Sequence, residues 1–203
     1  MDPLDITTYL GLAAVYLLAA NVLLGILMGA RYNTWKRWPH RRINLLKLHN
    51  WTAYVALGLS GAHPIPLLFV AKPQFRLLDI VYPIASPEQP VVNTLGAIAL
   101  YLLAFTVVTS IYRAEIGRQR WLPLHYFTYA IAGLVVVHGT LTNQHLDSSA
   151  VDIWDAEKVG IMACGLVVAL AAPARFWWTR RHPKFRPPDI RKAPPAGTNR
   201  AVL

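Results

Sequence analysis

The sequence predicts an all-α membrane protein, a polytopic bundle of five transmembrane helices. Three observations lead to this fold class. Hydrophobic residues make up 55% of the 203-residue chain and charged residues only 15%, whereas an average soluble domain carries about 25% charged residues. Five apolar stretches are long enough to cross a bilayer. The chain has a single cysteine, Cys164, which excludes an intramolecular disulfide and a metal site built from thiolates alone.

The five apolar stretches supply the five predicted helices. Each is long enough to cross a hydrocarbon core of about 30 Å at about 1.5 Å per residue. In lipid a helix satisfies its own backbone polar groups, and these stretches are too long and too apolar for barrel strands. No basic segment precedes the first stretch and no small-residue cleavage site follows it, so we expect it to be retained as a signal anchor. The stretches occupy residues 7–30, 44–70, 92–112, 122–142 and 158–178.

The charges are distributed unevenly between the two sides of this predicted bundle. Of the 20 basic residues, 17 lie in residues 31–47, in residues 113–120 or from residue 175 onward, and eight of the ten acids fall on the other side. The positive-inside rule then places the N-terminus outside and the C-terminus in the cytoplasm, and we expect the bacterial inner (plasma) membrane. The net charge of +10 is therefore interpreted as a topology signal and not as a nucleic-acid surface.

The chain is expected to form one ordered domain with a tail. Residues 7–178 make up the transmembrane domain, and the basic, proline-rich residues 179–203 are expected to be a disordered cytoplasmic extension. Residues 71–91 form the longest connection on the outer side, in which residues 75–82 are either a short interfacial helix or an ordered apolar cap. Pro64 and Pro66 are expected to end or kink the second helix.

Four histidines lie in two of the five predicted helices. His49 and His63 are 14 residues apart on the second helix, and His125 and His138 are 13 residues apart on the fourth. A single histidine in a span is commonly an interhelical hydrogen-bonding contact, but ionisable side chains in spans are costly and mark functional sites. Because the two helices run in the same direction, the histidines form two pairs at matching depth, about 20 Å apart.

The chemistry of imidazole suggests what these pairs hold. Two trans imidazoles fill the axial positions of a low-spin haem iron, whereas zinc or a di-iron cluster would need cysteine or carboxylate ligands at each level. We therefore predict that His49 and His125 bind an inner haem iron and His63 and His138 an outer one. A spacing of 13 residues leaves two side chains about 140° apart on an ideal helix. The fourth helix thus needs a bend, a tight turn or a rotated second haem, and Gly133 is a candidate position for the bend.

The histidine segments resemble a known family. Residues 48–54, which read LHNWTAY, and residues 61–63, which read GAH, resemble the first ligand helix of the ferric reductase-like transmembrane domain. Residues 121–129, WLPLHYFTY, and residues 137–139, VHG, resemble the second. This family includes NADPH oxidases, ferric reductases and the haem subunit of the periplasmic methionine sulfoxide reductase system. The resemblance covers residues 10–178 and implies two haem b groups, held by the four histidines, that carry electrons from inside to outside.

Two features depart from the family pattern. Family members commonly have six spans, and the first of these is missing here. No flavin or nicotinamide domain follows the fifth helix, and no G-x-G-x-x-G fingerprint is present. The electron donor must therefore be a separate protein, a free reduced flavin or a membrane quinol.

The sequence thus predicts a di-haem b protein that carries electrons from a cytoplasmic or membrane donor across the bilayer to an external acceptor. The acceptor could be ferric iron, oxygen or a partner reductase. The alternatives are a quinol-oxidising cytochrome b anchor subunit of a membrane oxidoreductase complex and a haem-free scaffold or transport subunit. His145, near Asp147, is a weaker candidate for binding a cationic metal substrate. Candidate partners of the haem propionates near the inner haem are Arg31, Arg41, Arg42, Lys47, Arg113, Arg118 and Arg120.

Overall fold

The structure is a computed structural model that describes residues 2–30, 44–143, 146 and 152–181. Residues 182–203 of the predicted tail and the histidines His40, His145 and His182 lie outside the described residues, whereas residues 179–181, also predicted as tail, belong to a helix that ends at Arg181. So do three of the candidate propionate partners, Arg31, Arg41 and Arg42.

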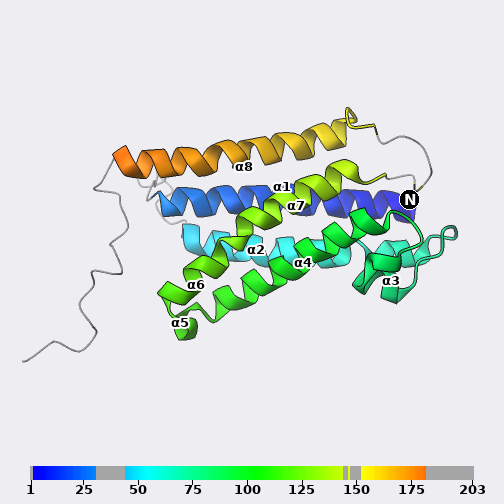
Figure 1. Cartoon of the computed structure of the whole chain (residues 1–203), viewed down its shortest axis with the longest axis horizontal. Coiled ribbons are helices and arrows are strands. Elements are labelled where there is room, and N and C mark those ends of the chain that lie inside the picture. The colour runs from blue at the N-terminus through cyan, green and yellow to red at the C-terminus, as the bar shows by residue number, and fades with distance from the viewer. Residues whose placement is uncertain (1, 31–43, 144–145, 147–151, 182–203) are drawn as a thin grey trace, which may run out of the picture.

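Five helical segments long and apolar enough to span a membrane run side by side along the long axis of the molecule (Figure 1). The predicted fold class is therefore confirmed: the described residues form helices, without strands. The side of the membrane on which each terminus lies stays a prediction. The spans are α1 (Pro3–Gly29), α2 (Leu45–Ala62) continued by the 3-10 helix η2 (Ile65–Phe69), α4 (Pro90–Ile111), α6 (Arg118–His125) followed by α7 (Phe127–Leu141), and α8 (Ala156–Arg181). The connections hold α3 (Leu77–Val81), η3 (Pro83–Ala85) and α5 (Arg113–Ile116).

Local sequence signals set the helix ends. Asp2 caps α1 by accepting a hydrogen bond from the backbone N–H of Leu4 at 3.1 Å, and Asn44 caps α2 through the N–H of Lys47 at 3.1 Å. The second span breaks where the prolines predicted it: α2 ends at Ala62, and the chain continues as η2. His63 is consequently the C-cap residue of α2, with its backbone N–H bonded to the carbonyl of Leu59 at 2.9 Å.

The fourth span is interrupted between its two histidines, which agrees with the bend or tight turn that was one alternative from their 13-residue spacing. The break falls at Tyr126, between α6 and α7, so Gly133 was the wrong position, because it lies inside the continuous helix α7. Pro123, three residues before the break, lies inside α6 and cannot donate a backbone hydrogen bond. The N–H of Tyr126 bonds to the carbonyl of Pro123 at 3.2 Å, and the N–H of Tyr129 to that of Tyr126 at 3.1 Å. Because these hydrogen bonds join residues three apart instead of four, the face that the helix presents changes just after His125.

Large apolar side chains cover the outside of the bundle. Leu166 is 60% exposed, Leu170 is 62% exposed and Phe105 is 44% exposed. The fully enclosed interior is small by comparison and centres on Ala56 and Ile131, which are 0% and 1% exposed. A surface of this kind is unstable in water and is the one expected of helices surrounded by lipid.

The spans pack as two helix pairs with a fifth helix laid against them. α1 contacts α2, and α4 contacts α7, while α8 packs on α1 and α7 (Figure 1). Val22, Ile26 and Val168 form the buried centre of the contact between α1 and α8. The two pairs carry the four histidines, and α8 carries none of them.

The two ends of the bundle differ in their charge, and one of them is covered by the segment that holds α3 (Figure 1). We define the cap as residues 71–91, which include α3 at the position expected for a short helix, and call its end of the bundle the cap end. The cap is anchored by the buried side chains of Phe75, Pro83 and Ser86. The hydroxyl of Tyr101 also donates to the carbonyl of Val81. The opposite end, which we call the basic end, carries Lys47, Arg113, Arg118, Arg120, Arg180 and Arg181.

Candidate metal centres

The four predicted histidines meet in two pairs. The ring centroids of His49 on α2 and His125 on α6 are 6.2 Å apart, with an angle of 72° between the ring planes. The ring centroids of His63 and His138 are also 6.2 Å apart, with an angle of 89°. We call these the basic-end pair and the cap-end pair. The structure thus brings together the residues that the sequence matched by depth.

The separation of the rings suits a metal ion between them. Imidazole nitrogens bind metals at about 2.0–2.1 Å, so two trans ligands, each with its ring centre roughly 1.1 Å behind the nitrogen, have centres about 6.3 Å apart. The observed 6.2 Å in both pairs agrees with this value. Among the described residues, no group of three or more His, Cys, Asp or Glu side chains is placed to hold a metal ion. A centre with two imidazoles therefore fits a metal whose other ligands come from a macrocycle.

Three of the four imidazoles bond to backbone carbonyls through Nδ1. The Nδ1 atom of His49 is 3.1 Å from the carbonyl oxygen of Asn21, that of His63 is 3.2 Å from Ser60, and that of His138 is 2.8 Å from Val92. A carbonyl oxygen can only accept, so each Nδ1 carries the proton and donates it. The lone pair of Nε2 is then free for a metal, which is the usual arrangement of a histidine ligand.

His125 has the same tautomer, but a side-chain hydroxyl group instead of a backbone carbonyl determines it. The hydroxyl of Ser110 donates its one proton to the carbonyl of Thr106 at 2.7 Å and accepts from Nε1 of Trp121 at 3.2 Å. Toward Nδ1 of His125, at 3.4 Å, Ser110 can therefore only accept. Trp121 also stacks on the His125 ring, with centroids 4.7 Å apart. All four imidazoles thus present a free Nε2.

Two glycines make room for the histidine rings. A Cβ atom at Gly25 would lie 3.3 Å from Cε1 of His49, and one at Gly96 would lie 2.7 Å from Cε1 of His138. Each glycine stands four residues after the carbonyl that its histidine bonds, Asn21 or Val92. Helical Cα–Cβ bonds tilt toward the N-terminus, so a side chain at that position would cover the carbonyl. Glycine leaves the carbonyl open to a second donor.

One comparison with known proteins gave a match. Residues 10–137 match the family model described as "Ferric reductase like transmembrane component". The chain belongs to this ferric reductase-like transmembrane family. Neither the curated proteins nor the solved structures gave a match. The matched range includes His49, His63 and His125 but ends one residue before His138, and it leaves out α8 entirely.

Members of the ferric reductase-like family generally bind haem, and a cavity adjoins each histidine pair. The cap-end pair lines a mainly apolar cavity of about 200 Å³ under the cap, and the basic-end pair lines a smaller one of about 50 Å³. Each cavity contains one residue whose buried hydroxyl has no hydrogen-bond partner among the described residues, Thr7 or Thr106. Such unpaired buried groups call for a partner from a bound molecule.

The two cavities are separated by a thin aliphatic layer. Leu18, Leu103 and Ile131 line both of them and belong to the buried core of the bundle. We call these three residues the partition. Because it contains no polar side chain, the partition keeps water out of the space between the two centres.

Three polar residues near the pairs were not singled out by the sequence. Asn21 is 6% exposed and donates from Nδ2 to the carbonyl of His49 at 2.6 Å and to the hydroxyl of Thr52 at 2.7 Å. A lone asparagine inside an apolar span was the signal that could have found it. The other two, Lys158 and Arg175, are cations on the inward side of α8. Of the propionate partners predicted from sequence, Arg113 lies within electrostatic range of His49.

Proposed function

We propose that this ferric reductase-like chain is a di-haem b membrane protein that carries electrons across the bilayer. The observation that supports it is the presence of two histidine pairs at two levels, each with ring centroids 6.2 Å apart. In this proposal His49 and His125 hold the inner haem iron, and His63 and His138 hold the outer one. Bound haem would supply reversible one-electron redox chemistry at each level.

The protein side chains would ligate, orient and insulate, without making or breaking substrate bonds. The hydrogen bonds from Nδ1 keep each imidazole in the tautomer that a metal requires. The partition provides a dry, low-dielectric layer between the two levels. If each histidine pair held a haem iron through both imidazoles, no coordination site would remain for substrate, and an acceptor would receive its electron at the edge of the bound group.

The charges support the orientation of the bundle, and the inside-to-outside direction of transfer is the one that the family resemblance implies. The basic end of the bundle faces the cytoplasm if the positive-inside rule holds, so the donor acts there and the acceptor meets the cap end. The donor would be a separate protein, a reduced flavin or a membrane quinol, and the acceptor ferric iron, oxygen or a partner reductase. We place the protein in the bacterial inner membrane, with residues 7–178 as the di-haem domain and 179–203 as its tail.

The purified full-length protein tests this proposal. We expect reduced-minus-oxidised absorption spectra with the Soret and α bands of six-coordinate haem b, and two haems per chain by the pyridine haemochrome assay. The matched control is His182→Ala, a histidine outside the predicted spans, which should leave both numbers unchanged. If the protein purified from haem-supplemented cells lacked these bands, the haem-free scaffold interpretation would remain and the di-haem proposal would be overturned.

A further inference from the structure

The fifth span has no assigned role in the sites described above. α8 contributes no histidine and lies outside the range that matches the family model. It nevertheless carries two cations that pack inward, the buried Lys158 in its first turn and the half-buried Arg175, which lies over Gly29 of α1, toward its other end. Buried cations in a membrane span are costly and require an anionic partner. Each of these two side chains is therefore expected to have an anionic partner.

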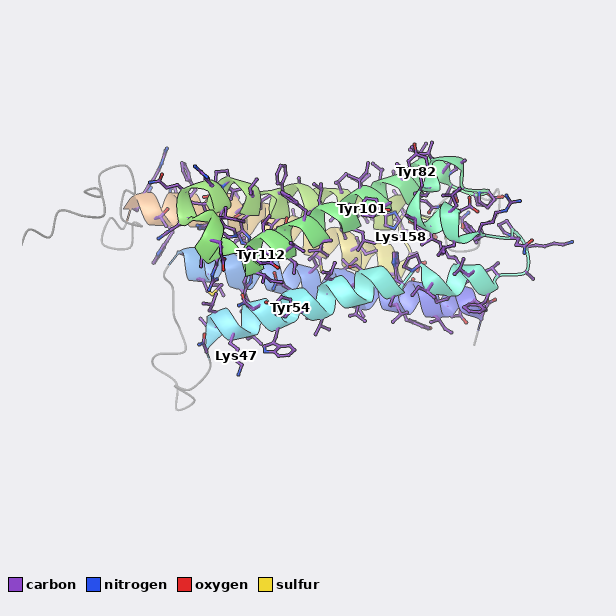
Figure 2. All side chains as sticks on the ribbon, turned by 90° about the horizontal axis from the view of Figure 1, so that it is seen from below. Lys47, Tyr54, Tyr82, Tyr101, Tyr112 and Lys158 are labelled. Carbon is purple, nitrogen blue, oxygen red and sulfur yellow. The ribbon has the colours of Figure 1, made fainter. Side chains whose placement is uncertain are left out.

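Lys158 is a buried cation at the cap end. The residue as a whole is 5% exposed, and its ammonium group has no hydrogen bond or ion pair with another described residue, while the nitrogen atom itself keeps some accessible surface. It precedes Ile161, which lines the cap-end cavity, by one helical turn. Ile161 in turn packs against Gly139, where a Cβ would lie 2.9 Å from its Cδ1 atom. Lys158 therefore lies near the His63–His138 level, toward the end of the bundle that carries Tyr82 of the cap and away from the end that carries Lys47 (Figure 2).

Arg175 occupies the corresponding place near the basic end. Its guanidinium group packs over Gly29 of α1, where a Cβ atom would clash with it. One Nη1–H points toward the hydroxyl of Tyr129 at 3.4 Å. The charge lies within electrostatic range of His125. No carboxylate among the described residues pairs with it, so its remaining donors are available to a bound anion.

The spacing of the two cations matches that of the two histidine levels. Lys158 and Arg175 are 17 residues apart on one helix, or about 25 Å along its axis, against about 20 Å between the histidine levels. Each haem b carries two propionate carboxylates, which need counter-charges when they are held away from water. Lysine offers a point charge and arginine a fork that matches a carboxylate.

We propose that α8 is the counter-charge helix of the di-haem domain, with Lys158 pairing with a propionate of the outer haem and Arg175 with a propionate of the inner one. This rests on the proposed function, because it needs the two haems. A cation beside a haem favours the ferrous state, which is less positive than the ferric state. Removing one cation should therefore lower the midpoint potential of one haem and leave the other almost unchanged.

The test is a potentiometric titration of the full-length protein with both haems bound. Lys158→Met should lower the midpoint potential, or the occupancy, of the haem that His63→Ala removes. Lys158→Arg should restore the wild-type values, and Arg175→Met should shift the other haem. Lys72→Met is the matched control, because Lys72 is an exposed lysine at the same end of the bundle. If Lys158→Met does not accumulate, Lys158→Gln provides the same comparison with a polar side chain.

The outcomes separate this inference from the proposed function. Wild-type protein without haem would overturn the proposed function and this inference together. Two haems whose potentials and occupancies are the same in the wild type, Lys158→Met and Lys158→Gln would overturn only the counter-charge role. A Lys158→Met protein that unfolds at lower temperature but keeps both potentials would also overturn it, because Lys158 would then pair with a carboxylate of the protein.

Discussion

The basic-end pair and the cap-end pair share one ring separation but are held differently. At the cap end both imidazoles donate to backbone carbonyls, and Gly96 packs directly against the His138 ring. At the basic end only His49 bonds to a carbonyl, while His125 has a long hydrogen bond to the Ser110 hydroxyl and a stacked Trp121. The cap-end cavity is also about four times the larger, 200 Å³ against 50 Å³.

This difference suggests that the two histidine levels have different roles. The basic-end centre is enclosed by helices, so a bound group there is positioned by side chains and has little space for a second molecule. The cap-end centre has a roomier cavity that is walled partly by the cap residues Phe75 and Asp79. We expect the acceptor to approach the cap-end centre, and the predictions below separate the two levels from the strongest effect to the weakest.

The largest effects should come from the ligands themselves. His63→Ala should remove the outer haem and stop electron transfer to an external acceptor, because one imidazole cannot complete a six-coordinate iron. His49→Ala should do the same at the inner level. The haem-to-protein ratio should fall from two to one in each variant, and the remaining midpoint potentials should differ between them. Retention of two six-coordinate haems in either variant would contradict the assignment.

The next largest effects should come from substitutions of the two glycines. The closer the added Cβ atom would lie to the histidine ring, the larger the expected effect. Gly96→Ala places a Cβ 2.7 Å from Cε1 of His138, whereas Gly25→Ala places one 3.3 Å from Cε1 of His49. Overpacking of this kind costs about 1–3 kcal/mol, so Gly96→Ala should lose more of the outer haem than Gly25→Ala loses of the inner one. Haem content after purification is the readout.

Gly58→Ala is the control for this pair, because a Cβ there meets nothing within 4 Å. It should keep both haems and the thermal stability of the wild type. If Gly96→Ala kept as much haem and thermal stability as Gly58→Ala, the role assigned to Gly96 would be contradicted.

Asn21 allows a test of the basic end through stability. Asn21→Leu removes the hydrogen bonds to the carbonyl of His49 and the hydroxyl of Thr52 and covers part of the same surface with an apolar side chain. Losing partners of buried polar groups costs about 1–3 kcal/mol, so the thermal unfolding temperature should fall. Dissociation of the inner haem should begin before that of the outer one, as followed by the Soret band. Simultaneous loss of both haems at an unchanged temperature would show that Asn21 does not support the basic-end site.

The smallest effect should come from the neighbours of His125. Ser110→Ala leaves Nδ1 of His125 without its acceptor and Nε1 of Trp121 without its partner. Because the His125 bond is already long, at 3.4 Å, we expect a small shift of the inner midpoint potential with full haem content. The outer potential serves as the internal control and should not move. An equal shift of both potentials would argue against two separately held centres.

The sequence was sufficient for the features that depend on composition and spacing. Hydropathy predicted the five spans, and the matching positions of the histidines predicted which of them would meet. Pro64 and Pro66 predicted the end of α2, because proline cannot continue the hydrogen-bond pattern.

Most of the features that were missed depend on contacts between helices. The exception is the break at Tyr126, because Pro123, three residues earlier, was a signal for it, whereas Gly133 offered only intrinsic flexibility. Gly25 and Gly96 matter because of the histidines opposite them, and nothing in their own segments marks that contact. Arg175 counts among the 17 basic residues of the predicted cytoplasmic side, and Lys158 is one of the three outside that pattern. Neither position indicates the burial of Lys158 or the packing of Arg175 over Gly29.

The most direct test of the central claim is electron paramagnetic resonance of the oxidised protein, with the haem content measured on the same sample. The ring planes are 72° and 89° apart, and nearly perpendicular axial imidazoles give strongly anisotropic low-spin ferric signals. We predict two such signals, two haems per chain and no high-spin ferric signal. A single signal with one haem per chain, or a high-spin signal from an iron with an open axial position, would contradict the pairing of the four histidines.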